Sequence, residues 1–220
     1  MKQSRALIVF AREPRQGRVK TRLLKVLDPG LVTSLYKAFV MDVLAQTAGL
    51  KDCARFLYYA DGETEPVFLN QFKSDFELVG QQGKDLGERM QRSASDCFQK
   101  GFQKVVIIGS DCLEITSGDL EQAFDRLEGS DFCFGPSSDG GYYLAGMKKF
   151  RPEIFTGVEW GTSAVLSKTL EIIGKIEHNV ALLDEKEDMD TIESLKRFSG
   201  RMETVPGAKE TKKILRTIKL

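Results

Sequence analysis

Short apolar runs alternate with amphipathic segments of helical length along almost the whole chain. The runs have the length and the β-branched or aromatic content of buried strands. Strands separated by helix-length segments require right-handed crossovers and favour a mostly parallel sheet. The chain is therefore predicted to be an α/β protein with a three-layer α/β/α, Rossmann-like fold. The expected strands are residues 6–10, 56–60, 76–79, 105–109, 132–134, 142–145 and 180–183, and the expected helices are residues 31–44, 86–98, 116–128 and 164–173.

Turn and capping residues mark several of these element ends. Asp61 and Gly62 close the second strand, and Thr116 with Asp119 resembles a capping box at the start of a helix. The lysine-rich stretch at residues 209–219 is expected to be an exposed helix or strand end. No repeat, low-complexity segment or linker interrupts the pattern, so we expect one domain over residues 1–220.

The composition is that of an ordinary globular protein without net charge. Lys plus Arg and Asp plus Glu number 32 each, which argues against a nucleic-acid-binding face. No apolar stretch approaches the roughly 20 residues of a membrane helix, and the start of the chain leaves no room for a secretory signal. The 4 cysteines lie far apart without a CxxC pair, and there is 1 histidine. We therefore expect a cytoplasmic protein with reduced thiols and no multi-histidine metal site.

A cationic loop, residues 11–22, follows the first expected strand directly. It holds five basic residues around a single glycine, Gly17. Open α/β sheets bind their ligands beyond the carboxyl ends of strands, and guanidinium groups with free glycine amides suit phosphate oxygens. The loop is either a phosphate site or a solvated turn that happens to be basic. It lacks the GxGxxG spacing of a dinucleotide-binding dehydrogenase.

Carboxylates follow two other expected strands. Asp111 comes directly after the run at residues 105–109, where its oxygens can hold a divalent cation. The alternative is a turn or N-cap aspartate, although the next helix starts only near Thr116. Asp188 and Asp190 lie at alternate positions and can both reach one hard cation if the backbone bends. In the alternative reading, Asp190 or Thr191 caps the following helix.

A glycine-rich segment at residues 134–143 joins two expected strands. An Asp-Gly pair between strands is a favoured hairpin turn, which is the structural reading of Asp139 and Gly140. The segment has more glycine than a hairpin needs, and Gly140 and Gly141 would let a ligand approach the backbone. Asp139 could then contact a sugar hydroxyl or act as a base toward an acceptor.

Several motifs in this order resemble the nucleotide-diphospho-sugar transferase superfamily, whose members have a Rossmann-like GT-A fold. Within it, the chain is most similar to small bacterial proteins described as glycosyltransferases. The resemblance runs from about residue 5 to residue 198. It rests on residues 10–12 (FAR), 20–23 (KTRL), 85–90 (DLGERM), 109–112 (GSDC), 135–136 (GP), 139–144 (DGGYYL), 160–163 (WGTS) and 188–191 (DMDT).

The resemblance implies a role for each motif. The first loop would hold the diphosphate, the stretch from Gly80 to Asp85 would lie near the nucleobase and ribose, and Asp139 with Tyr142 would face the acceptor. Asp111 would be the principal ligand of a Mg²⁺ or Mn²⁺ ion, completed by Asp188 or Asp190. Trp160 would line the pocket or anchor a loop. The candidate substrate-binding residues are Arg12, Gly17, Arg18, Lys20, Arg22, Gly83, Asp85, Gly140, Gly141, Tyr142 and Trp160, and the candidate catalytic residues are Asp111, Asp139 and Lys20.

The chain departs from the family at the edges of two motifs. Leu113 stands where a proline usually follows the Asp-Cys pair, and Ile192 and Ser194 replace the usual Pro and Asp of the last motif. The carboxylates themselves are intact. The first loop also has one glycine where sugar nucleotidyltransferases have several.

Three functions are compatible with these motifs. The preferred one is metal-dependent glycosyl transfer from a nucleotide-diphosphate sugar to a small-molecule acceptor. The second is nucleotidyl transfer, which releases pyrophosphate from a nucleoside triphosphate. The third is a non-catalytic nucleotide-binding protein. The single glycine of the first loop favours glycosyl transfer.

Overall fold

The computed structural model describes residues 4–60, 65–218 and 220. Within them, seven strands form one sheet in the order β3-β2-β1-β4-β6-β5-β7. The strands are β1 (Arg5–Arg12), β2 (Cys53–Ala60), β3 (Glu77–Gly80), β4 (Lys104–Ile108), β5 (Phe132–Pro136), β6 (Tyr142–Met147) and β7 (Val180–Leu182). β6 is antiparallel to both of its neighbours, and the other pairs are parallel. The predicted mostly parallel α/β sheet is confirmed.

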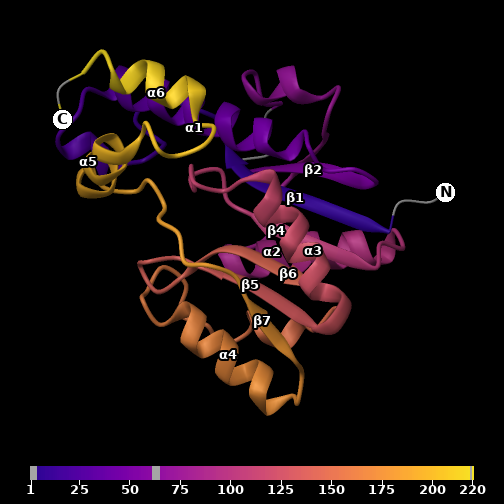
Figure 1. The fold of residues 1–220 in the computed structure, drawn as a ribbon. Coiled ribbons are helices and arrows are strands. Elements are labelled where there is room, and N and C mark those ends of the chain that lie inside the picture. Colours follow the sequence, from indigo (N-terminus) through magenta and orange to yellow (C-terminus); the bar gives the residue numbers. More distant parts are fainter. Residues whose placement is uncertain (1–3, 61–64, 219) are drawn as a thin grey trace.

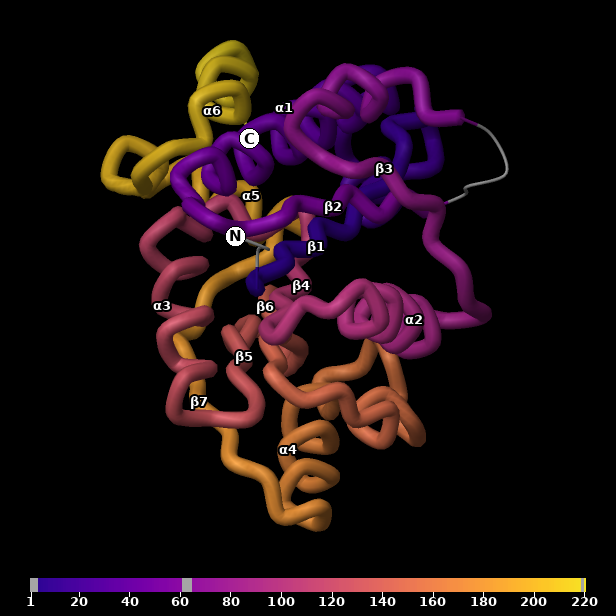
Figure 2. The backbone as a smooth tube through the Cα atoms, turned by 90° about the vertical axis from the view of Figure 1, so that its right-hand side faces the viewer, coloured from indigo at the N-terminus to yellow at the C-terminus, as the bar shows by residue number. Residues whose placement is uncertain are grey.

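Helices cover both faces of the sheet (Figures 1 and 2). Figure 2 shows the strands in a diagonal row with α1 and α3 on one side and α2 and α4 on the other. Each predicted helix is found within a few residues of its expected bounds. The α-helices are α1 (Pro29–Thr47), α2 (Leu86–Gln99), α3 (Ser117–Gly129), α4 (Val165–Lys175), α5 (Ile192–Arg201) and α6 (Lys209–Leu215), and the 3-10 turns are η1 (Leu23–Lys25), η2 (Leu69–Phe72) and η3 (Pro152–Phe155).

The alternation of side chains along β1 explains the three layers. Leu7 and Val9 pack into the core that α1 and α3 cover, whereas Ala6 and Ile8 pack into the core beneath α2 and α4. All four side chains are fully buried. A strand that is apolar on both faces needs cover on both faces, as parallel sheets usually have. The apolar run at residues 105–109 is typical of such a strand, and β4 indeed lies in the interior of the sheet, between β1 and β6.

The start of α3 agrees with the sequence expectation, whereas the helix near the C-terminus does not. The capping box of Thr116 and Asp119 is present at the start of α3, as predicted. The stretch at residues 209–219 was expected to be exposed, but its helix α6 packs against α1 (Figure 1). The buried carboxylate of Asp42 accepts hydrogen bonds from the backbone N–H groups of Glu210 and Thr211 and so caps α6. Local sequence could not reveal this contact because Asp42 lies in a distant helix.

The turn expected at Asp61 and Gly62 lies outside the described residues. Among the helices of the described chain, none is long and apolar enough to cross a membrane.

Candidate active site

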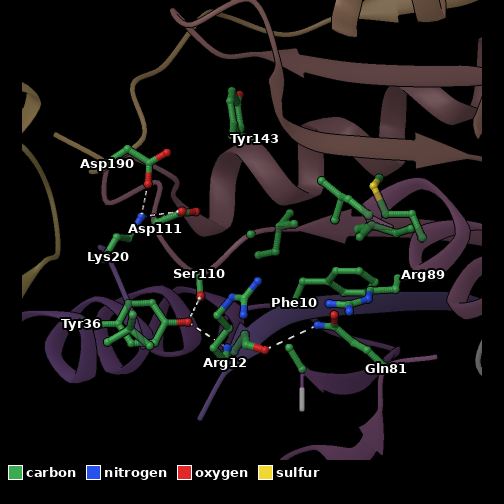
Figure 3. Close-up of a pocket in the computed structure, with 18 of the residues that line it drawn as sticks. Phe10, Arg12, Lys20, Tyr36, Gln81, Arg89, Ser110, Asp111, Tyr143 and Asp190 are labelled. Carbon is green, nitrogen blue, oxygen red and sulfur yellow. Dashed lines mark hydrogen bonds and ion pairs between the residues drawn. The ribbon is translucent and has the colours of Figure 1, made fainter. Parts of the chain in front are cut away.

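A cavity of about 790 Å³ opens at the carboxyl ends of β1 and β4 (Figure 3). These two strands are neighbours at the point where the sheet extends in opposite directions. β2 and β3 lie beyond β1, and β6 lies beyond β4. Such a switch point is where open α/β sheets bind ligands, because the loops on its two sides diverge and leave a crevice. The cationic loop after β1 and the segment after β4 both line the cavity.

Three apolar side chains hold the cationic loop in place. Pro14, Val19 and Leu23 are buried, and Val19 separates Arg18 from Lys20. The carboxylate of Glu13 accepts hydrogen bonds from the backbone N–H groups of Phe68 and Leu69, which ties the loop to η2. The cationic side chains of Arg12, Arg18, Lys20 and Arg22 all line the cavity. The loop is therefore an anchored wall of the cavity and not a free turn.

Lys20 lies between two carboxylates (Figure 3). Its Nζ is 2.7 Å from Asp111 Oδ2 and 2.6 Å from Asp190 Oδ1, and only 6% of the side chain is exposed. Burial alone would lower the pKa of Lys20, but the two aspartates raise it above its ordinary value. Lys20 in turn holds the pKa of Asp190 below its ordinary value, against the effect of burial. Lys20 is thus an ammonium, and its φ of 46° places it in the left-handed region.

Met189, which is buried, holds the last acidic motif (residues 188–191) next to the segment that contains Asp111. The backbone N–H of Met189 donates to the carbonyl of Asp111, 3.0 Å away, and the Met189 side chain is fully buried. This contact joins the segment after β7 to the segment after β4. Thr191 then caps α5 with Ser194, so that Asp190 is free of the capping role and faces Lys20. The capping reading of Thr191 is correct, and Asp190 belongs to the cavity.

The aspartates near the cavity are the candidate ligands of a divalent cation. Among the described residues, no group of three or more His, Cys, Asp or Glu side chains is arranged to hold a metal ion by itself. Asp188 is not among the residues that line the cavity: it accepts a hydrogen bond from Ser137, and its other oxygen is buried without a partner in the described chain. Burial and the Asp111 carboxylate raise the pKa of Asp188 to about 8. Asp111 and Asp190 do converge, on the ammonium of Lys20.

Two carboxylates are enough for one kind of metal site. Mg²⁺ commonly binds through one or two carboxylates, several waters and the phosphates of a substrate, without an all-protein cage. The oxygens of Asp111 and Asp190 point at one cation, and guanidinium groups for phosphate lie in the same cavity. The residues therefore fit a cation that arrives with a phosphorylated substrate.

Tyr36 of α1 connects the two strand ends beneath the cavity. Its hydroxyl accepts a hydrogen bond from the backbone N–H of Arg12, at 2.9 Å, and lies 3.1 Å from Ser110 Oγ. Only 5% of the residue is exposed, and burial raises the pKa of its hydroxyl. Tyr36 thus fixes where the backbone leaves β1 relative to the backbone after β4, which carries Asp111.

Apolar side chains form part of the cavity lining away from Lys20. Phe10, Leu86 and Met90 line this part together with the side chains of Gln81 and Arg89. The Gln81 amide donates to the carbonyl of Tyr58 at 2.8 Å and more weakly to that of Ala11 at 3.4 Å, which turns its oxygen toward the cavity (Figure 3). Apolar walls with a few oriented polar groups are typical of sites for flat heterocycles.

Asp139, Gly140 and Gly141 of the glycine-rich segment, and Gly17 of the cationic loop, lie outside the lining of the cavity. Asp139 is exposed and accepts a hydrogen bond from the N–H of Gly141, so the hairpin reading of this segment is correct. Gly140 has a φ of 89°, and a Cβ there would lie 2.1 Å from the carbonyl oxygen of Ser163. These glycines serve the β5–β6 turn and its packing. Gly17 faces solvent in the cationic loop.

The remaining predicted residues divide between lining and support. Asp85 lines the cavity, but its carboxylate also caps α2 through the N–H of Glu88. Tyr142 lines the cavity, whereas Gly83 and Trp160 do not. Trp160 packs against Gly87 so closely that a Cβ at Gly87 would lie 2.2 Å from its Nε1, and its ring meets Tyr142 edge to face. Trp160 is therefore a support for α2 and Tyr142.

Sequence reasoning missed Tyr36, Arg89 and Phe10 as cavity residues. Gln81 directly follows β3 and lies in the stretch from Gly80 to Asp85 that the resemblance places near the base, but it was not selected by itself. Arg89 and Phe10 belong to motifs that carry the family resemblance, but neither was selected. Tyr36 carried no signal, because it belongs to the apolar stripe of α1 like its core neighbours.

The fold and the site define an α/β protein of the nucleotide-diphospho-sugar transferase superfamily, with a cavity at the switch point of its sheet. The chain belongs to the family described as "Uncharacterized protein conserved in bacteria (DUF2064)", which matches residues 43–162. It is 31% identical to a proposed nucleotide-diphospho-sugar transferase from Desulfovibrio desulfuricans G20. That match covers 98% of this chain and 95% of the other, with a TM-score of 0.87.

Two more distant structures share the fold alone. One is CMP:2-keto-3-deoxy-manno-octonic acid synthetase in complex with CTP, at 11% identity and a TM-score of 0.53, covering 91% of this chain and 99% of the other. The other is Rv0371c from Mycobacterium tuberculosis H37Rv in complex with manganese, at 16% identity and a TM-score of 0.51, covering 90% of this chain and 98% of the other. Among curated proteins, no match to the chain is found.

Proposed function

We propose that the protein is a metal-dependent glycosyltransferase, which moves a sugar from a nucleotide-diphosphate donor to a small-molecule acceptor. The observation that carries this proposal is the charge arrangement of one cavity. Arg12, Arg18 and Arg22 line it on the loop after β1, and Asp111 and Asp190 face the same space from two other segments. Cations for phosphate and carboxylates for a divalent cation occur together where a metal-bound diphosphate is held.

The two ends of the cavity match the two ends of a nucleotide. The diphosphate would lie at the cationic end, and the base would lie between the apolar walls of Phe10, Leu86 and Met90. Gln81 and Arg89 would offer the base an acceptor and donors, since each is held by a backbone carbonyl. A cavity of about 790 Å³ has room for a nucleotide and a sugar, because ligand pockets commonly measure about 300–1,000 Å³.

The proposed reaction breaks the bond between the sugar C1 and the diphosphate oxygen and forms a bond from C1 to the acceptor oxygen, while the acceptor hydroxyl releases its proton to solvent. The nucleoside diphosphate leaves with an additional negative charge. When bound, Mg²⁺ or Mn²⁺ supplies electrostatic stabilisation of that charge, and Asp111 and Asp190 are the residues that would hold it. The loop arginines and Lys20 neutralise the phosphate oxygens that remain. Among the predicted catalytic residues, Asp139 has no part in this mechanism because it lies in the turn outside the cavity.

Nucleotidyl transfer is the second candidate, favoured by the fold shared with a synthetase that binds CTP. It would use the same cations and carboxylates but would release pyrophosphate. The resemblance associates several glycines in the first loop with nucleotidyl transfer, whereas this loop has one, Gly17, which is exposed and is not among the residues that line the cavity. We therefore rank glycosyl transfer first.

The leaving group distinguishes these functions. The purified protein is incubated with Mg²⁺ and either a panel of nucleotide sugars or a panel of nucleoside triphosphates, and the products are followed by ³¹P NMR. Glycosyl transfer, or hydrolysis when water is the acceptor, yields a nucleoside diphosphate. Release of pyrophosphate from a triphosphate without any nucleoside diphosphate from the sugars would instead establish nucleotidyl transfer.

A matched pair of variants connects the activity to the site. Asp111→Asn removes one charge from the cavity at constant shape, and we expect it to lower turnover at least about a hundredfold, as loss of a key electrostatic group does. Asp125→Asn makes the same chemical change on the exposed face of α3, and turnover should be unchanged. Equal turnover of the two variants would remove Asp111 from the mechanism.

A further inference from the structure

The position of Lys20 has a consequence for how a metal reaches this site. The ammonium takes the place at which the oxygens of Asp111 and Asp190 converge, with both contacts at 2.6–2.7 Å. These distances are those of short charge-assisted hydrogen bonds. A divalent cation held by the same two oxygens would need the same space.

Burial and backbone conformation, in addition to charge, keep the Lys20 ammonium between the two carboxylates. Its side chain is 6% exposed, so leaving the two carboxylates without another partner would bury an uncompensated charge. Its backbone is in the left-handed region, at a φ of 46°, a conformation that non-glycine residues adopt only at a cost. The neighbouring Val19 is buried in the core and fixes the direction in which Lys20 leaves the loop. The contact is thus a built feature of the loop.

We infer that Lys20 serves as an internal substitute for the divalent cation in the substrate-free protein, so that Lys20 and the metal exclude each other between Asp111 and Asp190. A diphosphate changes this balance, because its oxygens offer the ammonium a new partner. The cation then binds more tightly when the phosphates are present than when they are absent. This competition would weaken the binding of a metal to the free enzyme without its donor.

The inference rests on the proposed function for the identity of the cation, but its test does not. The test uses Mn²⁺ alone, without any nucleotide, so the absence of glycosyl transfer would not change its result. Free Mn²⁺ is measured by electron paramagnetic resonance during titration of the wild-type protein and of two variants. Lys20→Met removes the ammonium from between the carboxylates at similar side-chain length.

Arg22→Met is the matched control. It removes a positive charge from the same loop, but its guanidinium is 3.8 Å from Asp190 and the side chain is 64% exposed. Such exposed pairs contribute little, so Arg22→Met should tighten Mn²⁺ binding by no more than about threefold. Lys20→Met should tighten it by more than about tenfold, at one ion per chain, because the competing partner is gone. Adding Asp111→Asn to Lys20→Met should abolish the gain. Equal effects of the two single variants would overturn the inference.

A second measurement on the wild-type protein serves if Lys20→Met does not fold. An amine-acylating reagent is applied with and without Mg²⁺ at millimolar concentration, and modification of each lysine is followed by mass spectrometry. Lys20 should be protected in the absence of the metal and become at least about fivefold more reactive when Mg²⁺ displaces it. Lys25 and Lys37, which are exposed on η1 and α1, should not change. Unchanged reactivity of Lys20 at saturating Mg²⁺ would contradict the inference.

Discussion

Replacement of Tyr36 by phenylalanine tests whether one buried hydroxyl holds the two sides of the cavity together. The change removes a single oxygen and leaves the ring, so it creates almost no cavity in the core. The oxygen accepts the N–H of Arg12 at 2.9 Å and pairs with Ser110 at 3.1 Å. Without this oxygen, the N–H of Arg12 and the hydroxyl of Ser110 each lose a hydrogen-bond partner. Both lie next to Tyr36, which is only 5% exposed.

The expected cost follows from these contacts. A typical hydrogen bond contributes about 1 kcal/mol net, and a buried group left without a partner costs about 1–3 kcal/mol. We therefore expect Tyr36→Phe to lower the free energy of unfolding by about 2 kcal/mol. For a chain of this size, that corresponds to a fall of about 4–8 °C in the unfolding midpoint. Phosphate-containing ligands should also bind more weakly, since the backbone at Arg12 is no longer fixed.

The assay is thermal and urea denaturation followed by circular dichroism, with Tyr59→Phe as the matched control. Tyr59 is half-buried on β2, and its hydroxyl bonds to none of the described residues. The same chemical change there should alter the free energy of unfolding by less than about 0.5 kcal/mol. Equal effects of the two substitutions would refute the reasoning.

Three further changes test other contacts. Asp42→Ala removes the cap of α6 and should destabilise the protein by about 1–2 kcal/mol in urea denaturation, because two N–H groups lose their acceptor. Gly87→Ala pushes a methyl group into the ring of Trp160, the 1 tryptophan of the chain, and should shift its fluorescence emission and cost about 1–3 kcal/mol. Burial opposes the ionised form of Asp131, but hydrogen bonds from His178 and Lys149 dominate and lower its pKa to about 2. Its stabilising effect should therefore be complete above its unfolded pKa near 4 and disappear as the pH falls through about 2, seen as a shrinking stability difference from Asp131→Asn.

Local patterns in the sequence were sufficient for the elements of the fold. The strand at residues 105–109 could be recognised because it is apolar on both faces, and such a run has few alternatives to a central strand. Thr116 and Asp119 satisfy each other's backbone groups over three residues, so their capping box needs no tertiary information. The strand order could not be obtained this way, since it depends on which crossovers pack together.

The candidate site likewise contains residues that local sequence could identify and contacts that it could not. The cations at Arg12, Arg18 and Arg22 and the carboxylate of Asp111 were selected because they follow strands that end at one edge of the sheet. The ion pair between Lys20 and Asp190 spans most of the chain and depends on the contact of Met189 with the backbone of Asp111. No local pattern encodes that contact. At residues 136–141 the sequence left a hairpin turn and a ligand loop both open, because both use glycine.

The central claim is that one cavity holds a diphosphate and a divalent cation together, between the cationic loop and Asp111. Isothermal titration calorimetry with a panel of nucleoside diphosphates, with and without Mn²⁺, tests it most directly. We expect at least one nucleoside diphosphate to bind the wild-type protein, Mn²⁺ to tighten that binding by about tenfold or more, and Asp111→Asn to remove the metal-dependent gain. Binding that is unaffected by Mn²⁺, or that keeps its metal dependence in Asp111→Asn, would contradict the claim.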